Sequence, residues 1–283
     1  MKKNNQDREH FDEVVAIYNI MRPDYPDKLF SDIFDYVGIS GCKKAIEIGA
    51  GTGKATKPFL DIGYDITAIE ISANMADFLT KKFVQYEKLE VLTAPFEDIK
   101  LNNDKYDLIY AATAFHWVNA EIGCPKAFSL LKTKGVFALF RYYAVPAEGG
   151  DLYEEIQNVY EKYYHKPYIR PTRKAKDDYS KQPEIIKGFG FDDLNKFRFT
   201  DVTIKLYESV WTFSADDYMS LLDTYPDHKS LKDGDRMSLY NGIKDAILRH
   251  GGQIDVNYVF QLYMGRKCNI LKSDAKRATP TDI

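Results

Sequence analysis

A glycine-rich turn that follows a short apolar strand constrains this chain more than any other sequence feature. The turn is Gly49-Ala50-Gly51-Thr52-Gly53, and the strand before it, residues 44–48, carries Glu47 near its carboxyl end. Glycine can adopt the positive φ angles of a tight turn, and it lets a ligand approach because it has no Cβ. A second apolar run, residues 65–70, ends in Glu70, where a carboxylate can accept hydrogen bonds from both hydroxyls of a ribose. These segments predict a nucleoside pocket at the carboxyl edge of a parallel sheet.

The residues around the turn narrow the kind of nucleoside. A dinucleotide fingerprint needs Gly or Ala at its sixth position, where this chain has Lys54. A carboxylate at Glu47 would repel a pyrophosphate and attract an ammonium group. S-adenosylmethionine (SAM) has an amino group, a sulfonium and a ribose but no phosphate, so the local chemistry favours SAM over NAD. A P-loop is disfavoured further because no Gly-Lys-Ser or Gly-Lys-Thr sequence follows.

Short apolar runs alternate with helical patterns through the first half of the chain. Strands are expected at 44–48, 65–70, 89–93, 106–112 and 135–140, and helices at 53–62, 72–83 and 120–131. This alternation is typical of a doubly wound, mostly parallel α/β sheet. Ligands in such sheets bind at the carboxyl ends of the strands, so the glycine turn, Glu70, Pro95 and Ala112 should converge in space.

Several motifs resemble those of one enzyme family. The run from Glu47 to Gly53, together with Glu70, resembles the first two motifs of the class I SAM-dependent methyltransferases. Residues 106–117 resemble the fourth-strand motif of the same superfamily. The resemblance implies a Rossmann-like sheet of seven strands whose last two strands are antiparallel. Here those strands, expected at 198–213 and 253–266, would be separated by a helical insertion.

Two further segments are similar to one branch of that superfamily. Phe115-His116-Trp117, and upstream Tyr18 with Arg22-Pro23-Asp24-Tyr25-Pro26, resemble the methyltransferase type 11, trans-aconitate methyltransferase-like branch. The resemblance covers most of the chain, and its sharp motifs lie between Tyr18 and Trp117. It implies a small-molecule acceptor without naming one.

The patterns divide the chain into three parts. Residues 1–42 are expected to form an N-terminal helical cap, with helices near 9–20 and 29–37. Residues 43–145 would form the SAM-binding core. Residues 146–283 would supply cap helices near 151–164, 214–225 and 235–250, the last two strands of the sheet and a polar C-terminal tail.

The resemblance assigns most of the cofactor site. Gly49, Ala50 and Gly51 would line the methionine and ribose, and Glu47 would act on the amino group directly or through water. Glu70 would bind the ribose, although it could instead serve only as a charge at a helix N-terminus, with Ser72 as the cap. The predicted cofactor residues are Tyr18, Arg22, Glu47, Gly49, Ala50, Gly51, Glu70, Ile71, Met75, Phe96, Glu97 and Ala112.

Two parts of the cofactor site have competing interpretations. Ile71 and Met75 would flank the adenine, although they could simply pack in the core. Many relatives place an acid where this chain has Pro95, so the backbone near Phe96 or the side chain of Glu97 or Asp98 must read the adenine amino group. Glu97 could equally belong to a solvated turn. Arg22 can hold the SAM carboxylate in a bidentate manner, and its alternative is a surface charge beside a turn.

The acceptor should meet the cofactor after the fourth strand. A neutral imidazole at His116 could take a proton from a substrate hydroxyl or amine, although His116 could merely orient a loop. Positioning for in-line attack supplies much of the rate in such a transfer. The predicted substrate pocket consists of Tyr25, Phe115, His116, Trp117 and Tyr142.

Composition limits the partners of this chain. The 283 residues carry a net charge of −3, which provides no global attraction to nucleic acid. Cys42, Cys124 and Cys268 show no metal-binding spacing, and no His, Asp or Glu cluster has ligand spacing, so no metal is expected. The polar N-terminus lacks the apolar region of a signal peptide, and no apolar run approaches a membrane-spanning length. We expect a cytoplasmic monomer or homodimer that binds neither nucleic acid nor membrane.

The sequence thus predicts a SAM-dependent methyltransferase that transfers a methyl group to an oxygen or nitrogen of a small molecule, with carboxylates as one candidate class. S-adenosylhomocysteine (SAH) would be the product. An RNA or protein methyltransferase is one alternative, which the acidic charge balance disfavours. A non-catalytic SAM-binding sensor or scaffold is another, and an NAD oxidoreductase is a distant third.

Overall fold

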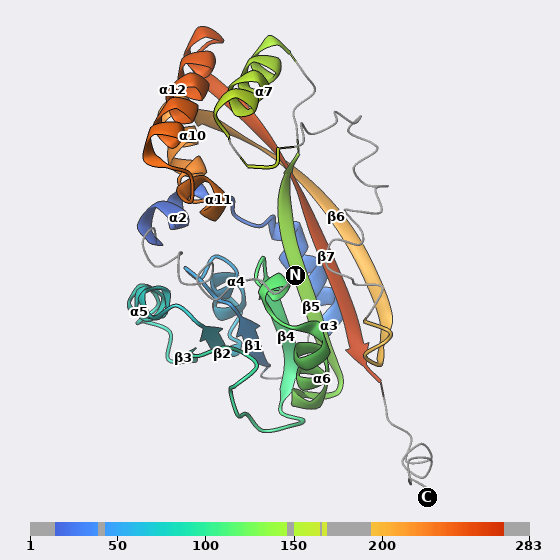
Figure 1. Ribbon diagram of the computed structural model, residues 1–283. Helices are drawn as coiled ribbons and strands as arrows, with labels where there is room; N and C mark the ends of the chain where they lie inside the picture. The colour runs from blue at the N-terminus through green and yellow to red at the C-terminus, as the bar shows by residue number, and fades with distance from the viewer. Residues whose placement is uncertain (1–14, 39–42, 146–149, 165, 169–193, 269–283) are drawn as a thin grey trace, which may run out of the picture.

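Seven strands form a single sheet in the order β3-β2-β1-β4-β5-β7-β6 in the computed structural model of this protein (Figure 1). The structure describes residues 15–38, 43–145, 150–164, 166–168 and 194–268. The strands are β1 (Lys44–Ile48), β2 (Asp65–Glu70), β3 (Leu89–Thr93), β4 (Tyr106–Ala112), β5 (Leu131–Val145), β6 (Phe199–Ser214) and β7 (Gln253–Lys267). The first five pair in parallel, and β7 is antiparallel to both β5 and β6. The predicted doubly wound, mostly parallel seven-stranded sheet is confirmed.

Helices cover both faces of the sheet because neighbouring strand residues point to opposite sides. Three helices cover one face of the sheet: α3 (Asp27–Val37), α4 (Thr56–Asp61) and α5 (Ala73–Lys82). They pack on the strand side chains that point to that face. On the opposite face, α6 (Ala120–Leu130) packs through Phe128. In β1, for example, Ala45 belongs to the first core and Ile46 to the second. The result is a three-layer sandwich whose strands are buried on both sides.

The three strands β5, β7 and β6 are much longer than their neighbours. They form an extension that rises above the rest of the sheet and carries most of the remaining helices (Figure 1). Pairing continues along this extension, with Arg141 opposite Gln261 and Val145 opposite Asn257. The strand predicted at 135–140 is therefore longer than expected, at 131–145, because β7 supplies hydrogen-bond partners over most of its length.

A helical cap stands on this extension. It contains α7 (Asp151–Tyr163), α10 (Ala215–Leu222), α11 (Pro226–Lys229) and α12 (Asp233–Arg249), and α2 (Val15–Met21) lies beside α10. The helix expected at 214–225 ends earlier, at Leu222, and a further short helix that was not expected, α11, begins at Pro226. As predicted, helices separate β6 from β7 in the chain.

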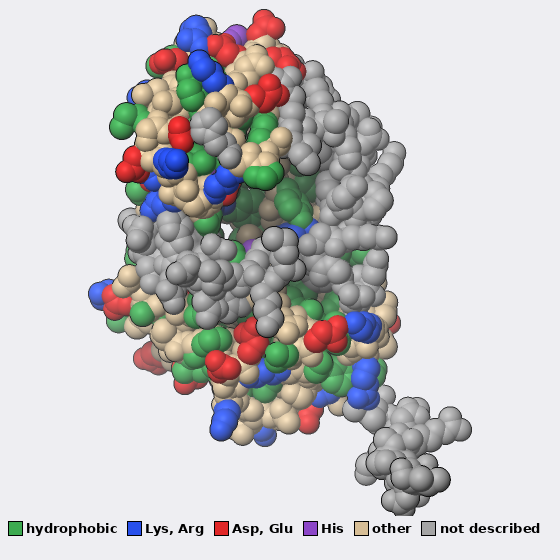
Figure 2. Space-filling view, viewed as in Figure 1, with side chains coloured by type: hydrophobic (Ala, Val, Ile, Leu, Met, Phe, Trp, Pro, Cys, Tyr) green, Lys and Arg blue, Asp and Glu red, His purple; other side chains and the backbone are tan. Residues whose placement is uncertain are grey.

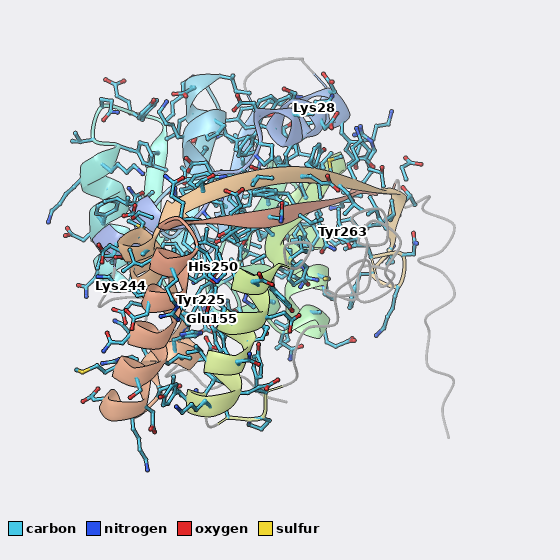
Figure 3. The ribbon with its side chains drawn as sticks, turned by 90° about the horizontal axis from the view of Figure 1, so that it is seen from above. Lys28, Glu155, Tyr225, Lys244, His250 and Tyr263 are labelled. Carbon is cyan, nitrogen blue, oxygen red and sulfur yellow. The ribbon has the colours of Figure 1, made fainter. Side chains whose placement is uncertain are left out.

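The cap has a small apolar core of its own. Leu222 of α10 packs there with Leu239 and Ile243 of α12 and Ile156 of α7. Figure 3 shows α7 beside α12, where Glu155 Oε2 lies 3.0 Å from Nε2 of His250. The cap therefore has its own hydrophobic cluster in addition to its contacts with the sheet.

Some predicted segments lie outside the described residues. These are the beginning of the helix expected at 9–20 and the polar tail. The division of the chain at residues 42 and 145 stays a prediction. Within the ranges that the structure describes, no helix is both long and apolar enough to cross a membrane.

Candidate functional site

The glycine turn after β1 needs its glycines for both conformation and space. Gly49, Gly51 and Gly53 have φ angles of 70°, 56° and 80°. A Cβ on Gly49 would lie 2.4 Å from the Cβ of Ala114, far inside van der Waals contact. The N–H of Gly49 also donates to the carbonyl of Ile69 at 2.7 Å, which ties the turn to the end of β2.

Glu70 stands at the end of β2 beside this turn. Its Oε2 accepts a hydrogen bond from the N–H of Gly51 at 2.7 Å, and its Oε1 accepts one from the N–H of Ser72 at 2.8 Å. The carboxylate therefore joins the glycine turn to the start of α5, where Ser72 caps the helix through Met75 N–H. Each carboxylate oxygen has two acceptor positions, so these bonds leave acceptor capacity for a ligand.

A cavity opens where the strands end, and we call it the strand-end cavity. It lies among the carboxyl ends of β1, β2 and β4 and the loops that follow them. Its lining residues are Tyr18, Ile48, Gly49, Gly51, Ile69, Glu70, Ile71, Met75, Ala94, Pro95, Phe96, Glu97, Ala112, Thr113, Ala114, Trp117 and Val118. Nine residues predicted for the cofactor therefore meet here: Tyr18, Gly49, Gly51, Glu70, Ile71, Met75, Phe96, Glu97 and Ala112.

A second cavity adjoins the first, and we call it the Arg22 cavity. Its lining residues are Tyr18, Arg22, Pro23, Tyr25, Gly49, Ala50, Gly51, Thr52, Lys54, Ala55, Ala112 and Tyr142. It shares Tyr18, Gly49, Gly51 and Ala112 with the strand-end cavity. Figure 2 shows the surface hollowed between the part that holds the cap helices and the part built around the sheet.

Arg22 brings a buried positive charge to the second cavity. Its Nη2 donates to the carbonyl of Thr224 at 3.0 Å, and its guanidinium carbon lies 4.0 Å from the ring centre of Tyr225. Both partners belong to the cap; Tyr225 is labelled in Figure 3. Nε of Arg22 and the hydroxyl of Tyr142 are buried, and neither makes a hydrogen bond of ordinary geometry within the described residues. The same is true of the Thr52 hydroxyl.

Glu47 lies behind the cavity walls rather than in them. It is fully buried, and its Oε2 accepts hydrogen bonds from Thr56 at 2.6 Å and Tyr110 at 3.0 Å. Its Oε1 has no hydrogen-bond partner among the described residues. Burial raises the pKa of Glu47 to about 8, although the two hydrogen bonds act in the opposite direction. Glu47 is thus not among the described residues that line either cavity, so the structure does not place it in direct contact with a ligand there.

The predicted substrate residues do not all meet. Tyr25 and Tyr142 line the Arg22 cavity, and Trp117 lines the strand-end cavity. Phe115 was expected in the pocket but is buried in the core, with its ring 5.2 Å from that of Phe137. The short 3₁₀ helix Phe115–Trp117 turns Phe115 inward.

His116 is half-buried next to Trp117, with 5.0 Å between ring centres. It is not among the described residues that line the two cavities. Its role as a base stays a prediction.

Sequence analysis missed Thr113 and Thr52 as cavity residues. Thr113 directly follows β4 and lines the strand-end cavity, and its hydroxyl lies 2.6 Å from that of Tyr25. Its position directly after a predicted strand is the sequence signal that could have identified it as a cavity residue. Thr52 stands inside the glycine turn, where only the glycines were singled out. Across the described ranges, no group of three or more His, Cys, Asp or Glu residues is arranged to hold a metal ion.

Comparisons with known proteins agree with this architecture. A family described as a methyltransferase domain matches residues 46–139. A Saccharomyces cerevisiae protein named "Probable S-adenosylmethionine-dependent methyltransferase" is 31% identical over 68% of this chain and 66% of its own length, just under two thirds. An uncharacterized methyltransferase of Schizosaccharomyces pombe is 24% identical over 90% of this chain and 96% of its own.

Solved structures share the fold. A candidate type II methyltransferase from Anaeromyxobacter dehalogenans has a TM-score of 0.58 and 18% identity, over 87% of this chain and 98% of that one. Phosphoethanolamine N-methyltransferase 2 of Haemonchus contortus, solved with phosphomonomethylethanolamine and SAH, has a TM-score of 0.52 and 9% identity, over 91% of this chain and 58% of that one. Residues 46–139 thus match a methyltransferase domain, and the chain is similar to SAM-dependent methyltransferases over most of its length.

Proposed function

We propose that this enzyme methylates an oxygen or nitrogen nucleophile of a small molecule, and that carboxylates are the first class of acceptor to test. The observation that carries the proposal is the Arg22 cavity. The charged residues that line it are Arg22 and Lys54, which suit the carboxylate of SAM, and Tyr25 and Tyr142 line the same cavity, where a small acceptor can approach the methyl group. Lys54 is paired with the exposed Asp24 at 2.5 Å, whereas the Arg22 guanidinium is buried.

The polar groups of the two cavities match the two ends of SAM. In the strand-end cavity, Glu70 supplies a carboxylate for ribose hydroxyls, and Ile71, Met75 and Phe96 supply apolar surface for an adenine. In the Arg22 cavity, the guanidinium can donate to a carboxylate. The buried Tyr142 and Thr52 hydroxyls and the Arg22 guanidinium give this cavity polar groups that fit an amino-acid head, and the Tyr142 hydroxyl also interacts with the guanidinium.

The chain's contribution to catalysis is mainly positional. SAM, when bound, supplies an electrophilic methyl group on a sulfonium for in-line transfer. The protein then has to hold the acceptor nucleophile in line with that methyl and to exclude water. We propose that Trp117, Tyr25 and Tyr142 form part of the wall that orients the acceptor, with His116 as a candidate base.

The position of the cap supports a small acceptor. Arg22 of the N-terminal segment donates to the carbonyl of Thr224 in the cap, and α2 packs beside α10. The cap and the N-terminal segment thus meet next to the Arg22 cavity. We also propose that the enzyme acts without nucleic acid or membrane partners, as a monomer or homodimer, and without a metal.

The proposal is tested by measuring SAH release from SAM with purified enzyme. Panels of small carboxylates, phenols and amines would be compared with total RNA and with a protein mixture. We expect turnover with a member of the small-molecule panels, carboxylates first, and its loss in Arg22→Ala. Turnover with RNA or protein alone would contradict the small-molecule proposal. SAM binding without turnover on any panel would favour a sensor or scaffold.

A further inference from the structure

Thr113 has a backbone conformation that its residue type rarely adopts. Its φ is 51°, and a β-branched residue with positive φ is a genuine outlier. The other described non-glycine residues with positive φ are Asp104, Lys134, Arg198 and Asp201, none of which is β-branched. Thr113 also lines the strand-end cavity. Strain of this kind persists where the surrounding structure holds it, and it concentrates at ligand sites.

The surroundings of Thr113 hold both its backbone and its hydroxyl. Its N–H donates to the carbonyl of Phe140 at 2.7 Å. Its Oγ1 lies 2.6 Å from the hydroxyl of Tyr25, and either oxygen can be the donor. The Tyr25 ring is fixed in turn by edge-on contacts with Phe140 and Phe260, at 5.0 and 5.9 Å between ring centres. The two hydroxyls therefore form a positioned pair.

This pair bridges the boundary between the two cavities. Thr113 lines the strand-end cavity and Tyr25 lines the Arg22 cavity, so their hydrogen bond connects one cavity wall to the other. If the ribose lies beside Glu70 and the amino-acid head beside Arg22, the atom that joins these two parts of SAM must lie at the same boundary. That atom is the sulfonium, which carries the positive charge and the transferable methyl group.

The chemistry of the pair suits a cation. Burial raises the pKa of Tyr25 well above its usual value, and Tyr142 adds to the shift, so the phenol is neutral at neutral pH. One hydroxyl hydrogen is used between the two residues, which leaves oxygen lone pairs available. Such lone pairs attract a neighbouring positive charge more strongly in a buried site than in water. The thioether of SAH has neither this charge nor the methyl group.

We propose that the hydroxyl pair of Tyr25 and Thr113 is the sulfonium subsite and sets the affinity for SAM relative to SAH. The proposal rests on the cofactor placement described under the proposed function. It makes these two residues positioning groups for the methyl donor. It also explains why a threonine keeps an unfavourable backbone angle at this point.

Calorimetric titration with SAM and with SAH tests the proposal. The variants Tyr25→Phe and Thr113→Val each remove one hydroxyl with little change in volume, and Thr113→Ser is the matched control that keeps it. We expect the dissociation constant for SAM to rise about three- to tenfold in the first two variants, while that for SAH changes less than about twofold. Thr113→Ser should keep the ratio of the wild-type protein.

The outcomes separate this inference from the cofactor placement. Equal losses for SAM and SAH, or an unchanged ratio in both Tyr25→Phe and Thr113→Val, would overturn the sulfonium subsite. Glu70→Ala should weaken both ligands together, because both contain the ribose. A wild-type protein that bound neither ligand would overturn the cofactor placement, and the subsite with it.

Discussion

Burial determines the protonation of single residues around this site, and Glu47 is the clearest case. Its side chain is fully buried and one carboxyl oxygen has no partner among the described residues. The hydroxyls of Thr56 and Tyr110 bond the other oxygen. Burial nevertheless dominates, and the pKa of Glu47 is raised to about 8. Near the end of β1, Glu47 is therefore mostly protonated at neutral pH.

This shift predicts how stability depends on pH. The pKa of Glu47 rises from 4.5 to about 8 on folding, so between these values the folded state holds a proton that the unfolded state loses. The contribution of Glu47 to stability is complete below about pH 4.5 and is lost as pH rises toward 8, by up to about 1.4 kcal/mol per pH unit. Glu47→Gln should remove this part of the pH dependence.

Denaturant unfolding between pH 5 and pH 8 measures the effect. The control is Glu87→Gln, which changes a carboxyl to an amide elsewhere on the molecule, outside the core. We expect the stability of wild type and of this control to fall more steeply with pH than that of Glu47→Gln. Parallel curves for all three proteins would show that Glu47 is ionised in the folded state.

Glu70 carries the second prediction at this scale. Glu70→Ala should weaken SAM binding by about 1–3 kcal/mol, because it removes hydrogen-bond acceptors that we assign to the ribose. Ser72→Ala is the control, since it removes the cap of α5 but no predicted ribose contact. It should lower stability by about 1 kcal/mol and leave affinity nearly unchanged. Unchanged SAM affinity in Glu70→Ala would refute the ribose assignment.

At the scale of elements, the glycine turn fits the sheet because α5 packs directly on it. A Cβ on Gly53 would lie 2.3 Å from Cε2 of Phe83 and 2.5 Å from Cδ1 of Leu79. Gly252, in the turn before β7, has nearly the same φ, 79° against 80°, but a Cβ added there would meet no described atom within 4 Å. The two glycines therefore separate backbone strain from steric overlap.

Alanine at each glycine tests this separation. Both Gly53→Ala and Gly252→Ala place a Cβ in the left-handed region, at a cost of about 1–2 kcal/mol. Only Gly53→Ala also overpacks α5, which should add about 1–3 kcal/mol. Urea unfolding of the two variants measures the difference. Equal destabilisation would mean that α5 moves aside without cost.

The elements also show what a sequence can and cannot predict. β1 to β4 lie where local apolar runs and turn residues placed them, since those signals are short-range. The length of β5 depends on pairing with β7, more than a hundred residues away in the chain, and no local pattern carries that information. Glu70 and the glycine turn were predictable because each lies where a strand ends, whereas the exclusion of Glu47 from both cavities depends on how its side chain packs. The orientation of Phe115 toward the core depends on the 3₁₀ helix Phe115–Trp117, and the aromatic sequence of this segment gives no signal for such a helix.

At the scale of the whole molecule, Arg22 links parts of the chain that are far apart in sequence. Its guanidinium donates to the carbonyl of Thr224 and lies over the ring of Tyr225, while the same residue lines a cavity at the glycine turn. The cap and the cofactor site therefore share one buried cation. We expect changes at Arg22 to affect both.

Arg22→Lys tests this coupling, because lysine keeps the charge but loses the planar fork of donors. SAM affinity should fall about tenfold or more, and amide exchange should rise in α10 and α11. Arg249→Lys is the control, since it alters a guanidinium in α12 that bonds Glu155 of α7 and not α10 or α11. Faster exchange in both variants, or in neither, would argue against a specific link through Arg22.

The central claim is that the two adjoining cavities bind an adenosyl amino acid and not a dinucleotide. Calorimetric titration of the purified protein with SAM, SAH and NAD tests it most directly. We predict binding of SAM and SAH with dissociation constants on the order of micromolar, about −8 kcal/mol, and no measurable binding of NAD. Binding of NAD, or failure to bind either adenosyl ligand, would contradict the account.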